Sequence, residues 1–184
     1  MDCYNTRVKT KSRIFLVGMM GAGKTTVGRQ LAKRLGKKFH DADREIEERT
    51  GVSVGVIFEI EGETGFRKRE AEAIEQLTAA DEIVLATGGG AVLDPRNREH
   101  LSSRGFVIYL HALPQVLWQR TRSDKSRPLL QGGDPRDRLE ALYRVRDPLY
   151  REVADLVIDT GRQGIGPLLS QVLARLDEAC RLSA

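Results

Sequence analysis

Short apolar runs alternate with stretches of helical period along most of this chain. Runs that are so continuously apolar are typical of strands buried on both faces of a parallel sheet, with helices covering those faces. The pattern therefore predicts an α/β fold with three layers, helices on either side of one parallel sheet. The predicted strands are Ile14–Val17, Lys38–His40, Ile83–Ala86, Phe106–Leu110 and Leu156–Ile158.

Helices are predicted between these strands from the spacing of apolar residues and from the residues that begin a helix. Val27, Leu31 and Leu35 recur four residues apart and so lie on one helix face. Asp94-Pro95 and Asp134-Pro135 each combine an N-cap residue with a proline in the first helical turn. A last apolar stripe follows Pro167 at a helix start and contains Leu168, Leu169, Val172, Leu173 and Leu176.

Two segments fall outside this regular pattern. Residues 1–11 form a short basic arm, which we interpret as a solvated leader, and residues 12–184 are expected to form a single domain. Residues 122–134 have polar ends, a proline and two glycines, so they predict a loop that is long enough to act as a mobile lid.

The composition excludes several classes of protein. The net charge is only +4 and both signs are interspersed, and with 5% aromatic residues there are few stacking platforms, so we expect no binding to nucleic acid. The isolated Cys3 and Cys180 suit a reducing compartment, and no apolar run is long enough to cross a membrane. We expect a soluble cytoplasmic monomer that does not bind membranes.

The strongest chemical signal is the segment Gly18–Thr25, which fits the pattern G-x4-G-K-[ST] directly after a strand and at the start of a helix. In this phosphate loop, glycines let backbone N–H groups surround the phosphates, Lys24 bridges the outer phosphates, and the Thr25 hydroxyl is offered to Mg²⁺. The expected ligands are therefore nucleotide phosphates and Mg²⁺, although the motif alone does not name a reaction. The predicted nucleotide contacts here are Gly21, Ala22, Gly23, Lys24, Thr25 and Thr26.

The acidic residues narrow the class further. An Asn-Lys-x-Asp motif is absent, which weighs against a regulatory GTPase, and the strand Ile83–Ala86 is not followed by an acid. Asp159 directly follows the last predicted strand, and we interpret it as a strand-end residue and not as the magnesium aspartate. Asp41 and Asp43 instead follow the second strand, where alternate residues would aim two carboxylates at the carboxyl edge of the sheet, one for the metal and one for the substrate. The alternative is that Asp43 only caps the next helix.

Two arginines share helix faces with apolar residues, where burial of a charge is expensive. Arg67 is aligned with Glu70 and Ile74, and Arg146 is aligned with Tyr143. Either their stems cover apolar surface while their heads reach water, or they form a clamp on a substrate anion. The glycines Gly88, Gly89 and Gly90 after the third strand would permit close approach of a ligand, or they form only a tight turn.

With these motifs in order over about residues 12–165, the chain closely resembles shikimate kinase. The resemblance rests on GMMGAGKTTVGR, the Asp41-x-Asp43 pair, the segment from Gly62 to Glu70, the three glycines, Arg127-Pro-Leu-Leu in the lid and Arg146-Asp-Pro-Leu-Tyr. It implies a P-loop kinase sheet of order 2-3-1-4-5 and transfer of the ATP γ-phosphoryl group to the 3-hydroxyl of shikimate, a step of aromatic amino-acid biosynthesis.

The resemblance also implies roles for single residues. It implies shikimate contacts at Asp43, Arg67, Gly89 and Arg146, with substrate-binding helices over about 43–77. Arg127 would reach the phosphates from the lid, and Asp41 would hold Mg²⁺ through water alongside Thr25. Lys24, Asp43 and Arg127 are thereby the expected catalytic residues. Arg120 would flank adenine, with Arg162 and Gln163 closing its pocket.

Two other functions stay open at this stage. One is a different kinase on the same fold, for gluconate or for a nucleoside monophosphate. The Arg67 and Arg146 pair favours an acceptor with a carboxylate over one that lacks it. The other is a nucleotide-dependent switch or binding module, which would hydrolyse ATP slowly and would not respond to shikimate.

Overall fold

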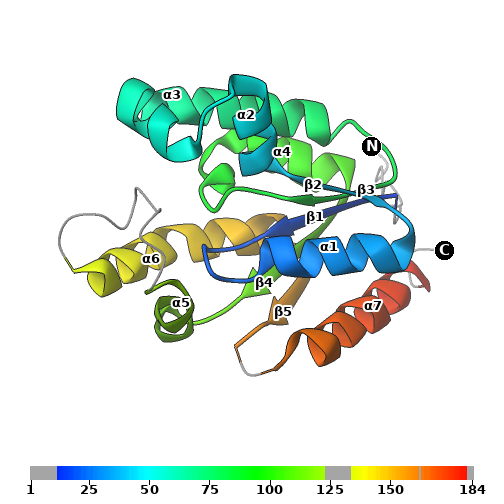
Figure 1. The fold of residues 1–184 in the computed structure, drawn as a ribbon. Coiled ribbons are helices and arrows are strands. Elements are labelled where there is room, and N and C mark those ends of the chain that lie inside the picture. Colours follow the sequence, from blue (N-terminus) through cyan, green and yellow to red (C-terminus); the bar gives the residue numbers. More distant parts are fainter. Residues whose placement is uncertain (1–11, 123–133, 162, 182–184) are drawn as a thin grey trace, which may run out of the picture.

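A computed structural model describes residues 12–122, 134–161 and 163–181 and contains one parallel sheet (Figure 1). The strand order β2-β3-β1-β4-β5 is the one expected from the resemblance. Every predicted strand is present, with bounds that differ by at most one residue. The strands are β1 Arg13–Val17, β2 Lys38–Asp41, β3 Ile83–Ala86, β4 Phe106–His111 and β5 Leu156–Asp159.

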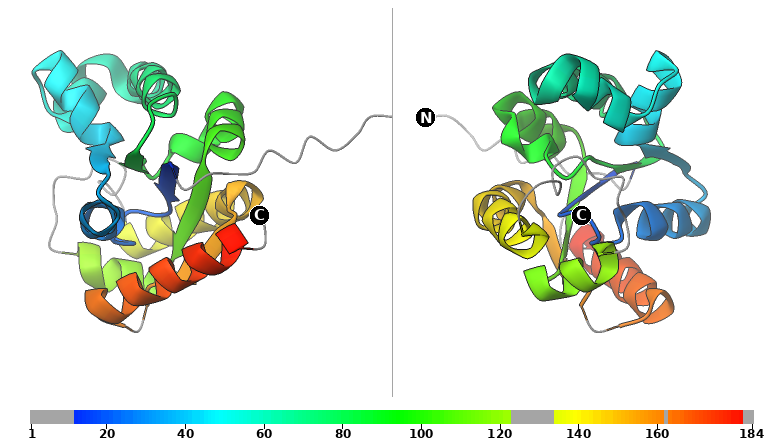
Figure 2. Two further views of the ribbon diagram at one scale, coloured as in Figure 1. Left: turned by 90° about the vertical axis from the view of Figure 1, so that its right-hand side faces the viewer. Right: turned by 60° about the vertical axis from the view of Figure 1, so that its left-hand side comes forward.

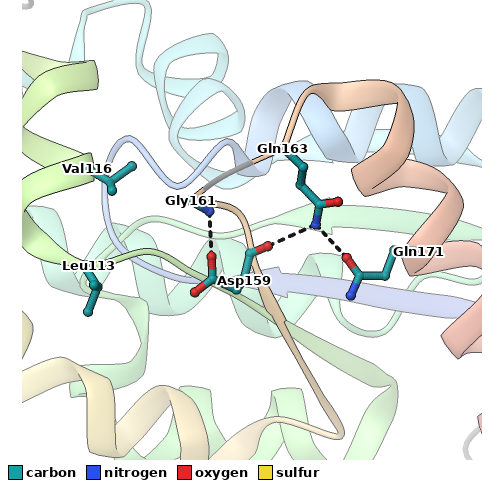
Figure 3. Close-up of a pocket in the computed structure, with 6 residues that line it drawn as sticks. All are labelled: Leu113, Val116, Asp159, Gly161, Gln163 and Gln171. Carbon is teal, nitrogen blue, oxygen red and sulfur yellow. Dashed lines mark hydrogen bonds between the residues drawn. The ribbon is translucent and has the colours of Figure 1, made fainter.

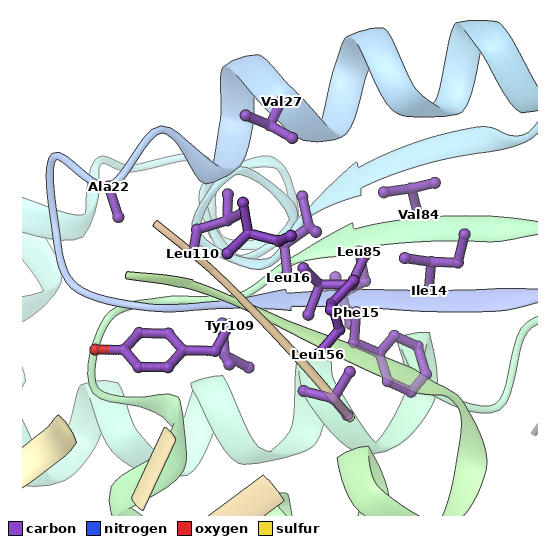
Figure 4. Packing of buried hydrophobic residues seen from close by; sticks show 14 of the residues in the cluster. Ile14, Phe15, Leu16, Ala22, Val27, Val84, Leu85, Tyr109, Leu110 and Leu156 are labelled. Atoms are coloured by element: carbon purple, nitrogen blue, oxygen red, sulfur yellow. The ribbon is translucent and has the colours of Figure 1, made fainter. Parts of the chain in front are cut away.

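The centre of the sheet is the centre of the core. Leu16 of β1 lies opposite Ala86 of β3 and Ile108 of β4, and residues 14–17 are completely buried. Helix residues such as Val27 pack onto this strand from above (Figure 4). From β1 the sheet extends in both directions, to β3 and β2 on one side and to β4 and β5 on the other. The carboxyl end of β1 is therefore the topological switch point, where α/β proteins bind ligands.

Helices cover both faces of the sheet. Helices α1 and α7 contact each other on one face, whereas α4 and α6 lie on the other (Figure 2). Helices α2 and α3 project beyond β2 (Figure 1). The helices are α1 Lys24–Leu35, α2 Ala42–Thr50, α3 Val54–Leu77, α4 Pro95–Arg104, α5 Pro114–Thr121, α6 Pro135–Val153 and α7 Ile165–Arg181, with a short 3-10 helix at Ala91–Leu93.

The predicted helix starts are confirmed. Asp94 and Asp134 are the N-caps of α4 and α6, and each accepts a hydrogen bond from the backbone N–H two residues later. Pro167 lies in the first turn of α7. The predicted lid falls almost wholly on residues 123–133, and the basic arm on residues 1–11; both lie outside the described residues.

Two local features differ from what the apolar pattern of the sequence predicts. Strand β5 was expected to be buried on both faces, but Val157 is 42% exposed because β5 is an edge strand with one open face. Helix α3 is interrupted at Gly62, whose φ of 69° is favourable only for glycine, so two helical segments meet there at a kink. Arg69 and Glu61 form an ion pair across this kink.

Among the described helices, none combines the length and the apolar character that a membrane-crossing segment requires.

Candidate active site

The phosphate loop follows β1 and leads directly into α1, as its sequence predicted. Gly21 and Gly23 have positive φ values of 78° and 95°, which let the chain turn tightly before the helix begins at Lys24. Nζ of Lys24 donates hydrogen bonds to the carbonyls of Gly18 and Met19, at 2.7 and 3.0 Å, so this side chain folds back across the loop. The N–H groups at the start of α1 and the lysine charge together favour an anion here.

A pair of oxygen donors lies beside this loop. Oγ1 of Thr25 donates a hydrogen bond of 2.7 Å to Oδ2 of Asp41, which brings the two predicted magnesium residues together. No group of three or more His, Cys, Asp or Glu residues suited to a metal occurs among the described residues. Two protein oxygens nevertheless fit Mg²⁺, since this ion keeps waters and phosphate oxygens as its other ligands.

The structure refines the prediction that Asp41 and Asp43 both follow the second strand as alternate residues at the edge of the sheet. Asp41 ends β2 and is the N-cap of α2, where its side chain accepts from the N–H of Asp43. Asp43 lies in the first turn of α2. The alternative that Asp43 only caps this helix is therefore wrong, because the cap is Asp41, two positions earlier.

Asp43 is a buried carboxyl with one unsatisfied oxygen. Oδ1 has no hydrogen-bond partner in the structure. Burial, together with the negative charges of Glu70 and Asp41, raises the pKa of Asp43 from 3.8 to about 7, against the opposing effect of Lys24 and Arg67. A carboxyl with this pKa can exchange a proton near neutral pH, and its free oxygen faces the glycine turn after β3.

Each glycine of that turn lies against a different polar side chain. A Cβ atom on Gly88 would collide with Glu70 Oε1 and would lie 2.9 Å from Asp43 Oδ1, and one on Gly90 would collide with the guanidinium of Arg67. A Cβ on Gly89 would lie 3.6 Å from Nη1 of Arg146. Close packing therefore requires glycine at positions 88 and 90, which a tight turn alone does not explain, whereas a Cβ at position 89 would make ordinary contacts.

Arg146 is a buried cation without a full set of partners. It is only 2% exposed, and its Nη1 has no hydrogen-bond partner among the described residues. Burial lowers the pKa of Arg146, and the positive charge of Arg67 lowers it further. The alternative in which the guanidinium of Arg146 reaches water is therefore wrong. An arrangement of this kind is stabilised by an anion that binds between the two arginines.

Arg67 is held in place by two carboxylates. Its Nη1 donates to Glu70 Oε2 at 2.6 Å, and its Nε and Nη2 donate to Glu63 Oε1 at 3.2 and 2.8 Å. Burial alone would lower the pKa of Arg67, but Glu70 and Glu63 outweigh this effect and raise it. Glu70 is itself 1% exposed, and burial raises its pKa. The Glu63 contact was not predicted, although its four-residue spacing from Arg67 is a recognisable helix signal.

The residues predicted to flank adenine lie beside the phosphate loop, next to the segment that follows β5. Nη1 of Arg120 donates to the carbonyl of Gly21 and to Oγ1 of Thr160, both at 3.2 Å, so it joins the loop to the segment after β5. Beside that segment is a cavity of about 430 Å³ between α5 and α7 (Figure 3). It is lined by Leu113, Val116, Asp159, Gly161, Gln163 and Gln171.

The hydrogen bonds of this cavity fix its polar wall. Nε2 of Gln163 donates to the carbonyl of Asp159 and to Oε1 of Gln171 (Figure 3). The Asp159 side chain accepts from the N–H of Gly161 and contacts His111, as befits a strand-end residue. Arg127 and Arg162, which were also expected at the nucleotide, lie outside the described residues.

The fold and the phosphate loop define the class of the protein as a P-loop kinase. A gluconokinase from Sinorhizobium meliloti shares this fold, with a TM-score of 0.61 at 17% identity over 94% of this chain and 95% of that one.

Comparison with known proteins gives the family. The shikimate kinase family model matches residues 20–177. A shikimate kinase of Burkholderia lata is 60% identical over 91% of this chain and 91% of its own length. The solved shikimate kinase of Acinetobacter baumannii in complex with shikimate has a TM-score of 0.89 and 49% identity, and covers 92% of this chain and 95% of that chain. The chain belongs to the shikimate kinase family and is an ATP- and Mg²⁺-dependent kinase with an alcohol acceptor.

Proposed function

We propose that the acceptor is shikimate and that it binds between the glycine turn and helices α2, α3 and α6. The observation that carries this proposal is the buried and incompletely bonded guanidinium of Arg146 beside Gly89. A carboxylate is the anion that a planar guanidinium fork bonds best. Arg146 of α6 and Arg67 of α3 both lie against the turn, so they would grip the carboxylate of shikimate and leave its hydroxyls facing the phosphate loop.

In this arrangement Asp43 would position the 3-hydroxyl and take its proton. The Asp43 Oδ1 atom is unpartnered and buried next to Gly88, which suits an oxygen that receives a hydrogen bond from a substrate. Phosphoryl transfer has a loose transition state, so the main contribution of this carboxylate is orientation of the hydroxyl. Helices α2 and α3, within residues 43–77, would thus form the acceptor-binding part of the protein.

The nucleotide would occupy the phosphate loop, with Lys24 on its outer phosphates. Thr25 and Asp41 would hold Mg²⁺, which when bound neutralises charge on the phosphates. Thr26 and the loop residues from Gly21 to Gly23 would complete the phosphate cradle. Arg120 and Gln163 would border adenine. For Arg127 and Arg162 the proposed nucleotide contacts rest on the sequence alone.

A coupled assay for ADP formation tests the acceptor. Wild-type protein with MgATP should form ADP slowly alone and much faster with shikimate, and the product should carry the phosphate on the 3-hydroxyl. Acceleration by gluconate or by a nucleoside monophosphate in place of shikimate would transfer the assignment to another kinase. Slow hydrolysis that no acceptor accelerates would instead favour a nucleotide-dependent switch.

We also propose that the enzyme works in the cytoplasm as a monomer, without binding nucleic acid or membranes. The balanced charges and the two isolated cysteines of the sequence support this proposal. Light scattering on the purified chain should give one mass of 20.5 kDa.

A further inference from the structure

Tyr150 connects three parts of the site through one hydroxyl group. This residue of α6 is 0% exposed, its hydroxyl donates to the carbonyl of Gly89, and the same oxygen lies 3.7 Å from Sδ of Met19. Gly89 belongs to the glycine turn and Met19 to the phosphate loop. The hydroxyl therefore lies at the contact between the two loops that would hold the acceptor and the nucleotide.

The position of Tyr150 on its helix relates it to Arg146. The two residues are four apart in α6, so their side chains project from the same face. Gly89, which accepts from Tyr150, is also close to Arg146 and to the phosphate loop, since a Cβ atom built on it would lie 3.6 Å from Nη1 of Arg146 and 3.5 Å from the backbone nitrogen of Met20. A small movement of Gly89 would change its distance to the guanidinium and to the phosphate loop at once.

The surroundings of Tyr150 keep its hydroxyl in one place and in one protonation state. Its ring packs against Tyr109 with centroids 4.9 Å apart. Burial raises the pKa of Tyr150, so the hydroxyl remains a hydrogen-bond donor at physiological pH. The Gly89 carbonyl would lose this donor if the hydroxyl were removed, and a buried carbonyl without a partner is unfavourable.

We propose that Tyr150 is a positioning residue for the acceptor. It acts through Gly89, which it holds against both the Arg146 guanidinium and the phosphate loop, and it does not touch the substrate. This inference rests on the proposed function, because it treats the Gly89 and Arg146 pair as part of the shikimate site. It predicts that the hydroxyl sets acceptor affinity, whereas a purely structural tyrosine would affect stability alone.

The substitution Tyr150→Phe removes the hydroxyl and keeps the ring packing. Tyr143→Phe is a matched control, because Tyr143 is on the same helix and its hydroxyl contacts Nε2 of His111 at 2.9 Å, away from the glycine turn. At a temperature where all variants are folded, Tyr150→Phe should raise KM for shikimate by about tenfold, the effect of one hydrogen bond. KM for ATP should change by less than about twofold, and Tyr143→Phe should leave both values near those of wild type.

Thermal unfolding supplies a second readout that does not depend on turnover. The rise in Tm that shikimate produces should shrink for Tyr150→Phe relative to wild type, while the rise produced by ADP should keep its size. Equal shikimate KM values and equal shikimate-induced Tm shifts in Tyr150→Phe and Tyr143→Phe would overturn the inference. Wild-type protein in the same series reports separately on the proposed function, since it must use shikimate whatever Tyr150 does.

Discussion

Thr25 and Asp41 are joined by a hydrogen bond of 2.7 Å, although one begins α1 and the other ends β2. The bond places a hydroxyl and a carboxylate oxygen at the mouth of the phosphate loop. Both are hard oxygen ligands of the kind that Mg²⁺ selects. We propose that this pair forms the metal site that the reaction requires.

Asp41→Asn should therefore raise the Mg²⁺ concentration needed for half-maximal activity, by about tenfold or more, because a neutral amide binds the ion more weakly than a carboxylate. Asparagine is a good N-cap, so α2 should remain folded. The measurement is the initial rate at fixed ATP over a Mg²⁺ titration. Asp94→Asn is the control, because Asp94 caps α4 in the same way, away from the site; a similar shift in both variants would contradict the assignment.

Lys24→Ala should leave the fold intact and reduce kcat by on the order of 10²–10³. A fixed cation beside the outer phosphates stabilises the charge that develops during transfer more than it stabilises bound ATP. Single-turnover and steady-state rates measure this loss, and Lys33→Ala, an exposed lysine of the same helix, serves as the control. A Lys24→Ala enzyme that keeps more than about a third of the wild-type kcat would rule out this role.

Asp43→Asn should lower kcat by about 10²–10⁴, since the acceptor hydroxyl loses its base, with little change in nucleotide affinity. A collapse of ATP affinity with unchanged acceptor affinity would assign Asp43 to the metal site instead. Kinetics in both substrates, with direct measurement of ATP binding, distinguishes these outcomes.

The same substitution should also change how stability depends on pH. The pKa of Asp43 is about 7 in the folded protein, whereas an ordinary aspartate has a pKa of 3.8. Between pH 3.8 and about pH 7 the folded state therefore binds more protons than the unfolded state. The free energy of unfolding should then fall as pH rises from about 4 to about 7. Without metal or nucleotide, Asp43→Asn should unfold at higher denaturant than wild type at pH 8, and this advantage should disappear near pH 4. An advantage that does not vary with pH would show that the buried charge is not its source.

Arg67→Ala and Arg146→Ala should each weaken acceptor binding by about 30-fold or more and leave ATP binding near normal, because removal of one partner of a buried charge pair costs roughly 2–5 kcal/mol. Arg67→Lys should also be damaging, since lysine lacks the planar fork. Loss of Glu70, which holds Arg67 at 2.6 Å, should give a milder form of the same defect.

The carboxylate clamp can be separated from general damage by comparing two acceptors. Wild-type enzyme should strongly prefer shikimate to its methyl ester, and Arg67→Ala should lose most of that preference. The measurement is kcat/KM for each acceptor on each enzyme. Equal use of acid and ester by the wild type would falsify the clamp.

The sequence by itself determined the sheet and the phosphate loop. The apolar strands and the motif from Gly18 to Thr25 are local signals, because a buried parallel strand must be apolar along its length and a phosphate cradle needs glycine at fixed spacing. Helix starts at Asp94 and Asp134 were equally predictable, since capping involves only neighbouring residues.

Tertiary structure alone decided which side chains meet. The sequence left Arg146 between a solvated head and an anion clamp, and only the packing of α6 against the glycine turn buries it. It likewise left Asp43 between a cap and a substrate contact, and only the packing of α2 against the glycine turn buries Oδ1 of Asp43 beside Gly88. No periodicity predicted the contact of Tyr150 with Gly89 and Met19, because it joins residues 61 and 131 positions apart. Burial and contacts across such distances depend on how the layers pack, and this information is absent from any local pattern.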